Sequence, residues 1–240
     1  MSEAGRLSDG AFLIRRALRV ALADALRENR PGGGEFTLLD VGGRGRPYAG
    51  LVAESQGDLQ RKINHIVLDS GLQNAGPAVV STAEQLPILS GAAGMVLCTQ
   101  VLEHVADPRA ALSEMARVLP PGGVCLLTTH GTWFYHPDPV DFWRWTPAGL
   151  ARLFRESGFE HVTVRPVGGT KLSLAVLMLT ALDRASGSGP LGGIVRGFFI
   201  VPCNWILWRL LRTRITGRES EPGELVIDYI VTASRSAPAS

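Results

Sequence analysis

Two aspartates lie at the ends of short apolar segments, where a parallel sheet commonly binds a cofactor. Asp40 ends the run FTLLD, and a turn that contains Gly42 and Gly43 follows it. Glycines at this point let the backbone approach a ligand closely and start the next helix. Asp69 ends a second apolar run, where a carboxylate can accept hydrogen bonds from both ribose hydroxyls. This pattern predicts a site for an adenosyl ligand without phosphates.

The loop after Asp40 argues against the commonest nucleotide cofactors. A dinucleotide site would read GxGxxG, and a phosphate-binding loop would read GxxxxGK[ST]. The loop instead reads Gly42-Gly43-Arg44-Gly45-Arg46-Pro47-Tyr48. NAD, FAD and nucleoside triphosphates therefore fit this sequence badly.

The segments that must position these residues alternate between strand-like and helix-like patterns. Such alternation is typical of a mostly parallel sheet covered by helices. We expect strands at 36–41, 64–68, 94–98, 123–129 and 160–165, and a last strand at about 225–233. Asp107 and Thr146 are the expected N-caps of two helices between these strands, each followed by proline.

An amphipathic helix is expected at about 8–28, since Ile14, Leu18, Leu22 and Leu26 share one face. We favour packing on the protein's own sheet over a membrane or targeting role. The N-terminus has no secretory signal pattern, and we expect a cytoplasmic protein.

Composition limits the class of protein. The chain has 240 residues and a formal net charge of +2, which is too small to favour binding to nucleic acid. Three scattered cysteines form no CxxC pair, which argues against a disulfide framework and a zinc site.

Residues 171–215 are strongly apolar and leave two interpretations open. The longest uncharged run, 197–208, has 12 residues, fewer than the roughly 20 that a spanning helix needs, so a transmembrane segment is not expected. We favour helices that pack on the domain, roof the acceptor pocket or form a homodimer. The alternative is a helix in a membrane interface, because four arginines lie around Trp205 and Trp208: Arg196, Arg209, Arg212 and Arg214.

Residues 83–130 contain VLEHVADP, ARVLPPGG and LLTTH, and they resemble the class I S-adenosylmethionine-dependent methyltransferases. GRGRPY and HPDPVDFWRWTPAGLARLFRESGF further resemble a bacterial subgroup of these enzymes. The resemblance implies an α/β, Rossmann-like, mostly parallel seven-stranded sheet with helices on both faces. It also implies one domain over 1–240, with its core at 36–169 and a helical insertion at about 171–215 before the last strand.

The resemblance also implies S-adenosyl-L-methionine as cofactor, with S-adenosyl-L-homocysteine as product. Asp40, Gly42, Gly43 and Arg44 would lie at its methionine end and Asp69 at its ribose. Thr82 and Ala83 would lie beside the adenine and Gln100 beneath the sulfonium. The chain departs from the family pattern at three of its positions, Arg44, Thr82 and Gly94.

Methyl transfer to oxygen or nitrogen needs alignment and a base. His130 and His136 are the candidate bases, with His136 preferred. The expected acceptor-binding residues follow the fifth strand: Trp133, Tyr135, Asp138, Trp143 and Arg144. Arg144 has a second interpretation, an ion pair with Asp141 that only fixes the loop. No metal is expected, because Gln100 replaces the first acid of the Glu-x-x-Glu-His pattern of metal-dependent relatives.

We therefore expect a methyltransferase that acts on a small molecule, such as a natural product or a sugar or lipid-linked glycan precursor. The alternative is a methyltransferase-fold protein that has lost methyl transfer and catalyses a cofactor-assisted rearrangement or serves as a non-catalytic partner. A nucleic-acid or protein methyltransferase is disfavoured, since the chain has neither a basic surface pattern nor an Asn/Asp-Pro-Pro-Tyr motif.

Overall fold

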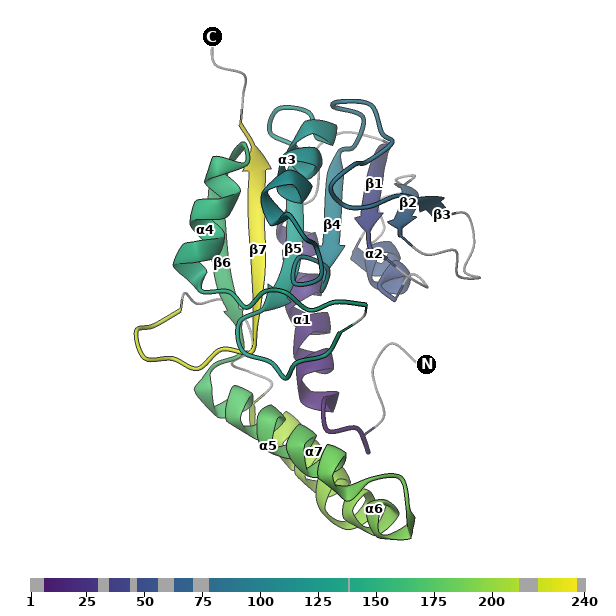
Figure 1. Cartoon of the computed structure of the whole chain (residues 1–240), viewed down its shortest axis with the longest axis vertical. Coiled ribbons are helices and arrows are strands. Elements are labelled where there is room, and N and C mark those ends of the chain that lie inside the picture. Colours follow the sequence, from purple (N-terminus) through teal and green to yellow (C-terminus); the bar gives the residue numbers. More distant parts are fainter. Residues whose placement is uncertain are drawn as a thin grey trace.

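The computed structural model describes residues 7–29, 35–43, 47–55, 63–70, 78–137, 139–211 and 220–236. Its centre is a seven-stranded sheet with the order β3-β2-β1-β4-β5-β7-β6 (Figure 1). The strands are β1 (Phe36–Val41), β2 (Ile63–Asp69), β3 (Ala78–Val80), β4 (Met95–Thr99), β5 (Val124–His130), β6 (Phe159–Val167) and β7 (Asp228–Arg235). Only β7 runs antiparallel to its neighbours. The expected Rossmann-like sheet is confirmed, and β3 is the strand whose position the sequence did not reveal.

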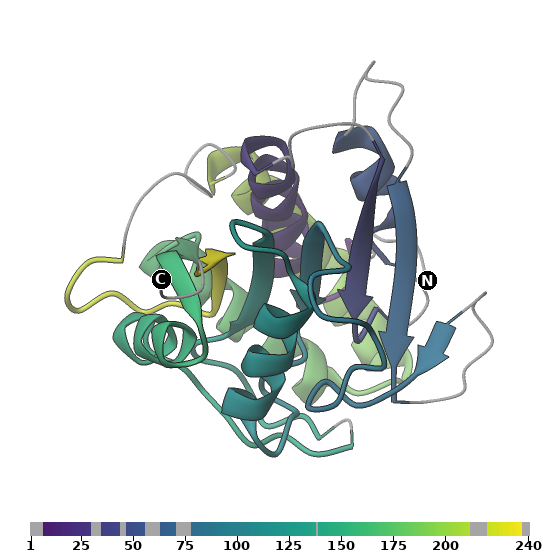
Figure 2. The same ribbon diagram turned by 90° about the horizontal axis from the view of Figure 1, so that it is seen from above.

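Helices cover both faces of this sheet (Figure 2). On one face, α3 (Pro108–Val118) and α4 (Pro147–Glu156) bury their apolar side chains against the strands. The other face is covered by α1 (Phe12–Glu28), α2 (Ala49–Ser55) and α5 (Thr170–Ser186). The sheet is thus buried on both sides, which explains why its central strands are continuous apolar runs.

The helix starts follow the expected cap chemistry at two of three places. The Asp107 carboxylate accepts from the backbone N–H groups of Arg109 and Ala110, and the Thr146 hydroxyl accepts from Gly149. The N-terminal helix begins at Phe12, later than the expected position near residue 8. Its apolar face is buried as predicted, including Ile14 and Leu22.

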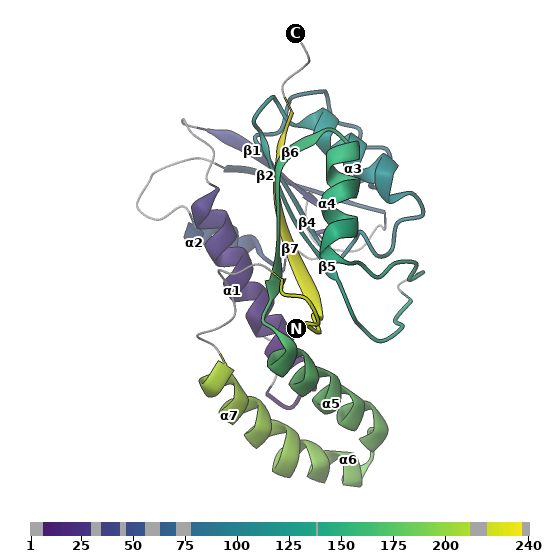
Figure 3. The same ribbon diagram turned by 90° about the vertical axis from the view of Figure 1, so that its left-hand side faces the viewer.

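The helical insertion before the last strand forms a hairpin (Figure 3). After α5 come α6 (Pro190–Val195), a π-helical turn η1 (Arg196–Ile200) and α7 (Val201–Leu211). The π-helical turn lies just before Pro202, which has no N–H for the usual helical hydrogen bond. Within the turn, the N–H of Val201 donates to the carbonyl of Arg196, as in a π-helix.

The three segments after α5 form one continuous helix, Pro190–Leu211, of 22 residues. Its length, together with a mean hydropathy of 1.4 over an 18-residue window, makes it long and apolar enough to cross a membrane by length and composition. The sequence argument that no segment reaches this length was wrong, because it counted only uncharged residues and stopped at Arg196.

Candidate cofactor and acceptor site

The carboxyl ends of β1, β2, β4 and β5 meet at one edge of the sheet. Asp69, Gln100 and His130 lie at or directly after these ends. Because β7 runs antiparallel, its first residue lies at the same edge, and Asp228 is paired with His130 in the strand register. The fold thus brings Asp69, Gln100, His130 and Asp228, which are far apart in the sequence, to one site.

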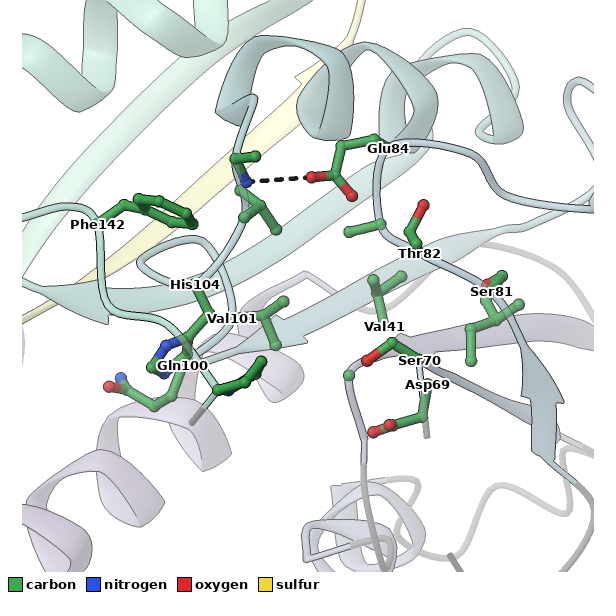
Figure 4. Close-up of a pocket in the computed structure, with 16 residues that line it drawn as sticks. Val41, Asp69, Ser70, Ser81, Thr82, Glu84, Gln100, Val101, His104 and Phe142 are labelled. Carbon is green, nitrogen blue, oxygen red and sulfur yellow. Dashed lines mark hydrogen bonds between the residues drawn. The ribbon is translucent and has the colours of Figure 1, made fainter. Parts of the chain in front are cut away.

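A cavity of about 410 Å³ opens at this edge between β1, β2 and β4 (Figure 4). Five of the residues expected at the cofactor line it: Gly42, Asp69, Thr82, Ala83 and Gln100. Gly42 has φ +74°, and a Cβ there would lie 2.2 Å from Cγ2 of Val101, so only glycine leaves this turn unstrained.

Asp40 and Gly43 do not line the cavity, although both were expected at the cofactor. The Asp40 carboxylate is fully buried beneath the loop, with Oδ2 3.2 Å from Nε2 of His65. A Cβ at Gly43 would lie 2.3–2.5 Å from that carboxylate. Asp40 and Gly43 therefore contribute to the shape of the turn from its buried side.

Arg44 and Asp138 lie outside the described residues. The other two departures from the family pattern are in the structure. Gly94 lies directly before β4, where a Cβ would lie 3.1 Å from Cβ of Phe36, so a larger residue would pack tightly there, away from the site. Thr82 replaces the acid that is usual in the family, but the structure shows a carboxylate nearby that the sequence did not reveal. Glu84 lines the same cavity, and its Oε1 accepts a hydrogen bond from the N–H of Ala106 at 3.2 Å (Figure 4).

The lining fits an S-adenosyl group. Val41, Leu68, Ala83 and Val101 provide apolar walls, while Asp69 provides a carboxylate. The cavity lies in the size range of small-molecule sites, about 300–1,000 Å³. Among its described lining residues there is no lysine or arginine, which suits a ligand without phosphates.

A second cavity, of about 350 Å³, adjoins the first. Helix α1 forms one wall, and strand ends and the loop after β5 form the other. Its lining consists of Ala11, Ile14, Arg15, Leu18, Pro47, Tyr48, Gln100, His130, Trp133, His136 and Asp228. Gln100 lines both cavities and has a left-handed backbone, φ 55°, a conformation that is uncommon for a residue other than glycine.

His130 lies between two buried carboxylates. Its Nδ1 is 2.5 Å from Oδ1 of Asp228, and its Nε2 is 3.4 Å from Oε1 of Glu103. Burial by itself lowers the pKa of His130, but the charge and hydrogen bond of Asp228 and the charge of Glu103 outweigh it, and the net direction is upward. Burial also raises the pKa of Glu103, whose other oxygen accepts from the Thr129 hydroxyl.

His136 has the opposite electrostatic environment. Burial lowers its pKa, and the charge of nearby His130 lowers it further. Its Nδ1 faces two acceptors, the carbonyl of Phe134 at 3.3 Å and the Asp141 carboxylate at 3.4 Å. The proton therefore belongs on Nδ1, and Nε2 keeps a free lone pair. Neighbouring groups whose pKa values are driven apart are characteristic of acid–base sites.

Arg144 forms an ion pair with Asp141, which is the second interpretation that the sequence left open for Arg144. Both terminal nitrogens of Arg144 contact the Asp141 carboxylate, at 2.5 and 2.6 Å, and this pairing lowers the pKa of Asp141 strongly. Arg144 also donates to the backbone carbonyls of Trp133 and Phe134. The contacts of Arg144 fix the loop, and Arg144 does not line the second cavity.

Of the three aromatic residues that the sequence assigned to the acceptor, Trp133 lines a cavity, whereas Tyr135 and Trp143 do not. Trp133 lines the second cavity and stacks on His130 with ring centres 5.4 Å apart. Tyr135 is 72% exposed, and Trp143 donates from Nε1 to the carbonyl of Val105; neither lines either of these two cavities. Instead Phe142 covers the first cavity, because its backbone N–H is bonded to the Glu103 carbonyl.

Tyr48 is a polar residue of the second cavity that the sequence interpretation did not assign to the acceptor. Burial raises its pKa to about 12, and the charges of Asp228 and Asp40 add to this effect. Its hydroxyl therefore stays protonated near neutral pH and can donate a hydrogen bond.

Three side chains of the site have the composition of a metal centre. Ligand atoms of Glu103, His130 and His136 all lie within 4.8 Å of one another. This set differs from the Gln100, Glu103 and His104 pattern considered in the sequence, since the His104 ring faces the carbonyl of Val140. The arrangement can either hold a divalent cation or transfer protons.

Comparison with known proteins agrees with the fold. The structure is similar to the [4+2]-cyclase SpnF, with a TM-score of 0.54, 18% identity and coverage of 90% of this chain and 80% of that one. It is similar to phosphoethanolamine N-methyltransferase 2 of Haemonchus contortus in complex with S-adenosylhomocysteine, with a TM-score of 0.54, 14% identity and coverage of 90% and 52%. The fold is that of the class I methyltransferases.

Sequence comparison adds the domain family. Residues 57–127 match the family described as a methyltransferase domain. An uncharacterized methyltransferase of Mycobacterium sp. (strain JLS) is 34% identical over 129 residues, which are 50% of this chain and 48% of the relative. The chain thus spans about half the length of this relative.

Proposed function

We propose that this protein is an S-adenosylmethionine-dependent methyltransferase that acts on a small-molecule acceptor. The cofactor would occupy the first cavity and the acceptor the second. The observation that supports this assignment best is Gln100, which lines both cavities at the point where they adjoin. When bound, S-adenosylmethionine supplies an electrophilic methyl group on a sulfonium.

The residues of the chain have separate roles in this proposal. Asp69 accepts from the ribose hydroxyls, and the apolar walls hold the adenine. Gln100 aligns the acceptor with the methyl group, which is the main requirement of an in-line displacement. Nε2 of His136 takes the proton of an acceptor hydroxyl or amine, while Asp141 orients the His136 ring.

His130 has a supporting role in this scheme. Its imidazolium compensates Asp228 and Glu103, both of which have fully buried side chains. Burial and, after it, the positive charge of His130 lower the pKa of His136, which favours a neutral His136 that can accept a proton near neutral pH.

A non-methylating catalyst is the second candidate, and the similarity to a cyclase is the observation that favours it. The two candidates differ in their products. A methyltransferase converts its cofactor to S-adenosylhomocysteine in step with acceptor consumption, whereas a rearrangement leaves the cofactor unchanged.

The cofactor assignment is tested by titration calorimetry of the full chain with S-adenosylhomocysteine. We expect saturable binding of one ligand per chain, and NAD serves as the control ligand that should give no binding heat. A folded protein that binds neither S-adenosylmethionine nor its product rules out both candidates as formulated.

The pH dependence of methyl transfer should report His136. A base must be deprotonated, and burial holds the pKa of His136 below its usual value of 6.5. The rate should therefore rise on the acid side of pH 6.5 and be constant above it, as measured at saturating cofactor over the acid and neutral range. A rate that rises only in the alkaline range would contradict His136 as the base.

We also propose that the group of Glu103, His130 and His136 works without a metal ion. The positive charge of His130 already lies next to Glu103, the one carboxylate of this group, and next to the neighbouring carboxylate of Asp228. Dialysis against EDTA should leave the rate of methyl transfer unchanged. Loss of activity that added Mn²⁺ or Zn²⁺ restores would instead assign these side chains to a metal centre.

A further inference from the structure

The hairpin of α5, α6, η1 and α7 has an extensive exposed apolar face. Its inner side buries Leu172, Val176, Leu179 and Ile200 together with the polar side chains of Ser173, Thr180 and Asn204. Its outer side exposes large apolar ones, among them Met178, Leu191, Phe198, Phe199, Trp205 and Leu210. In the helix Pro190–Leu211, only 11% of the most apolar 18-residue window is buried. The core helix of a soluble protein would be mostly buried, and so large an exposed apolar face indicates a binding surface.

The hairpin is held in place by polar contacts on its inner side. Nδ2 of Asn204 donates to the carbonyls of Leu7 and Asp9, and Asp183 accepts from the N–H of Gly10. The guanidinium of Arg16 lies 5.3 Å from the ring centre of Trp208. These contacts fasten both arms of the hairpin to the start of α1 and to the residues just before it.

The charges of the hairpin favour an anionic partner. Residues 170–211 contain four basic side chains and one acidic one, Asp183, which is paired with Arg196 at 2.7 Å. Arg209 lies over the ring of Trp205, 5.3 Å from its centre. Arginine beside exposed tryptophan suits the boundary between lipid headgroups and acyl chains. A second copy of the chain would bring like charges together.

The hairpin is also close to the acceptor cavity without covering it. α5 begins three residues after β6 ends, and Val167 is paired with Asp228 at the edge of the site. The start of α1, to which the hairpin is fastened, contributes Ala11 and Ile14 to the second cavity. None of the described hairpin residues lines either cavity, so the expectation of a roof over the acceptor is not supported.

We propose that this hairpin docks the protein onto an anionic lipid bilayer, with its outer apolar face inserted between headgroups and acyl chains. The hairpin forms one end of the molecule, away from the last residues of β7, where a flat surface can reach it (Figures 1 and 3). The docking itself does not depend on methyl transfer. Taken together with the proposed function, it favours an acceptor that is anchored in the same bilayer.

Flotation of the full chain with vesicles tests this proposal. We expect the protein to float with mixed phosphatidylcholine–phosphatidylglycerol vesicles and less with phosphatidylcholine alone. Phe198→Glu should lower the bound fraction relative to free protein about tenfold or more, since it places a charge in the inserted face. Leu89→Glu is the matched control: Leu89 is 82% exposed, against 76% for Phe198, but lies before β4 at the opposite edge of the sheet.

Three results would overturn the proposal. The wild-type protein would fail to float with either vesicle, or Phe198→Glu would float as well as wild type. The third such result would be a dimer seen by light scattering without lipid that Phe198→Glu converts to a monomer. The exposed apolar face would then be the contact between two copies of the chain. Flotation needs neither cofactor nor acceptor, so its outcome is independent of the catalytic assignment.

Discussion

Replacing His136 by alanine is expected to lower the rate of methyl transfer about 10²–10⁴-fold, the usual contribution of a positioned base. The affinity for S-adenosylhomocysteine should stay unchanged, because His136 lines the second cavity and not the first. The rate is measured as transfer of labelled methyl groups from S-adenosylmethionine to acceptors in an extract of the source cells.

The matched control is His161→Ala, which removes an exposed histidine on β6. His130→Ala should also slow the reaction, and it should shift the acid limb of the pH profile upward, since the charge that lowers the pKa of His136 is lost. If both His130→Ala and His136→Ala keep near-normal rates, the base lies elsewhere or alignment alone drives the reaction.

Asp69→Ala should weaken binding of S-adenosylhomocysteine by about 1.5–3 kcal/mol, the range for hydrogen bonds to a charged group. This corresponds to an affinity loss of about 10- to 150-fold. Asp69 is largely buried, so thermal unfolding must accompany the titration to separate lost affinity from lost fold.

Glu160→Ala is the control for this change, because it removes an exposed carboxylate from β6. An Asp69→Ala protein that is folded and binds the ligand as tightly as wild type would remove Asp69 from the cofactor site.

The sequence predicted most of the fold because local patterns agreed with the global arrangement. The buried strands are continuous apolar runs, and Asp107 and Thr146 are caps that the structure confirms. β3 was missed because it has three residues, too few for any periodicity. The start of α1 was misplaced because its N-cap, Ala11, makes no side-chain bond that the sequence could signal.

The site was only partly predictable. Asp69 and Gln100 follow apolar strands, so their common edge could be inferred from parallel topology. Asp228 was missed because it begins the antiparallel strand β7. Arg15 was missed because the sequence assigned its helix to packing alone, whereas that helix also lines the second cavity. Tyr135 and Trp143 were assigned to the acceptor on residue type alone, which does not indicate the direction of a side chain.

The apolar C-terminal region shows a similar limit. The sequence indicated unusual hydrophobicity, but it did not show which side of each helix faces the domain. Only the packed structure reveals that the polar Asn204 points inward while Phe198 and Trp205 point outward. The proposed interfacial role of the hairpin rests on this exposed apolar face.

A crystal structure of the protein with S-adenosylhomocysteine tests the central assignment most directly. The account predicts the ligand in the cavity between β1, β2 and β4, with its ribose at the Asp69 carboxylate and its sulfur beside Gln100. A ligand bound elsewhere, or one whose sulfur points away from the second cavity, would contradict the account.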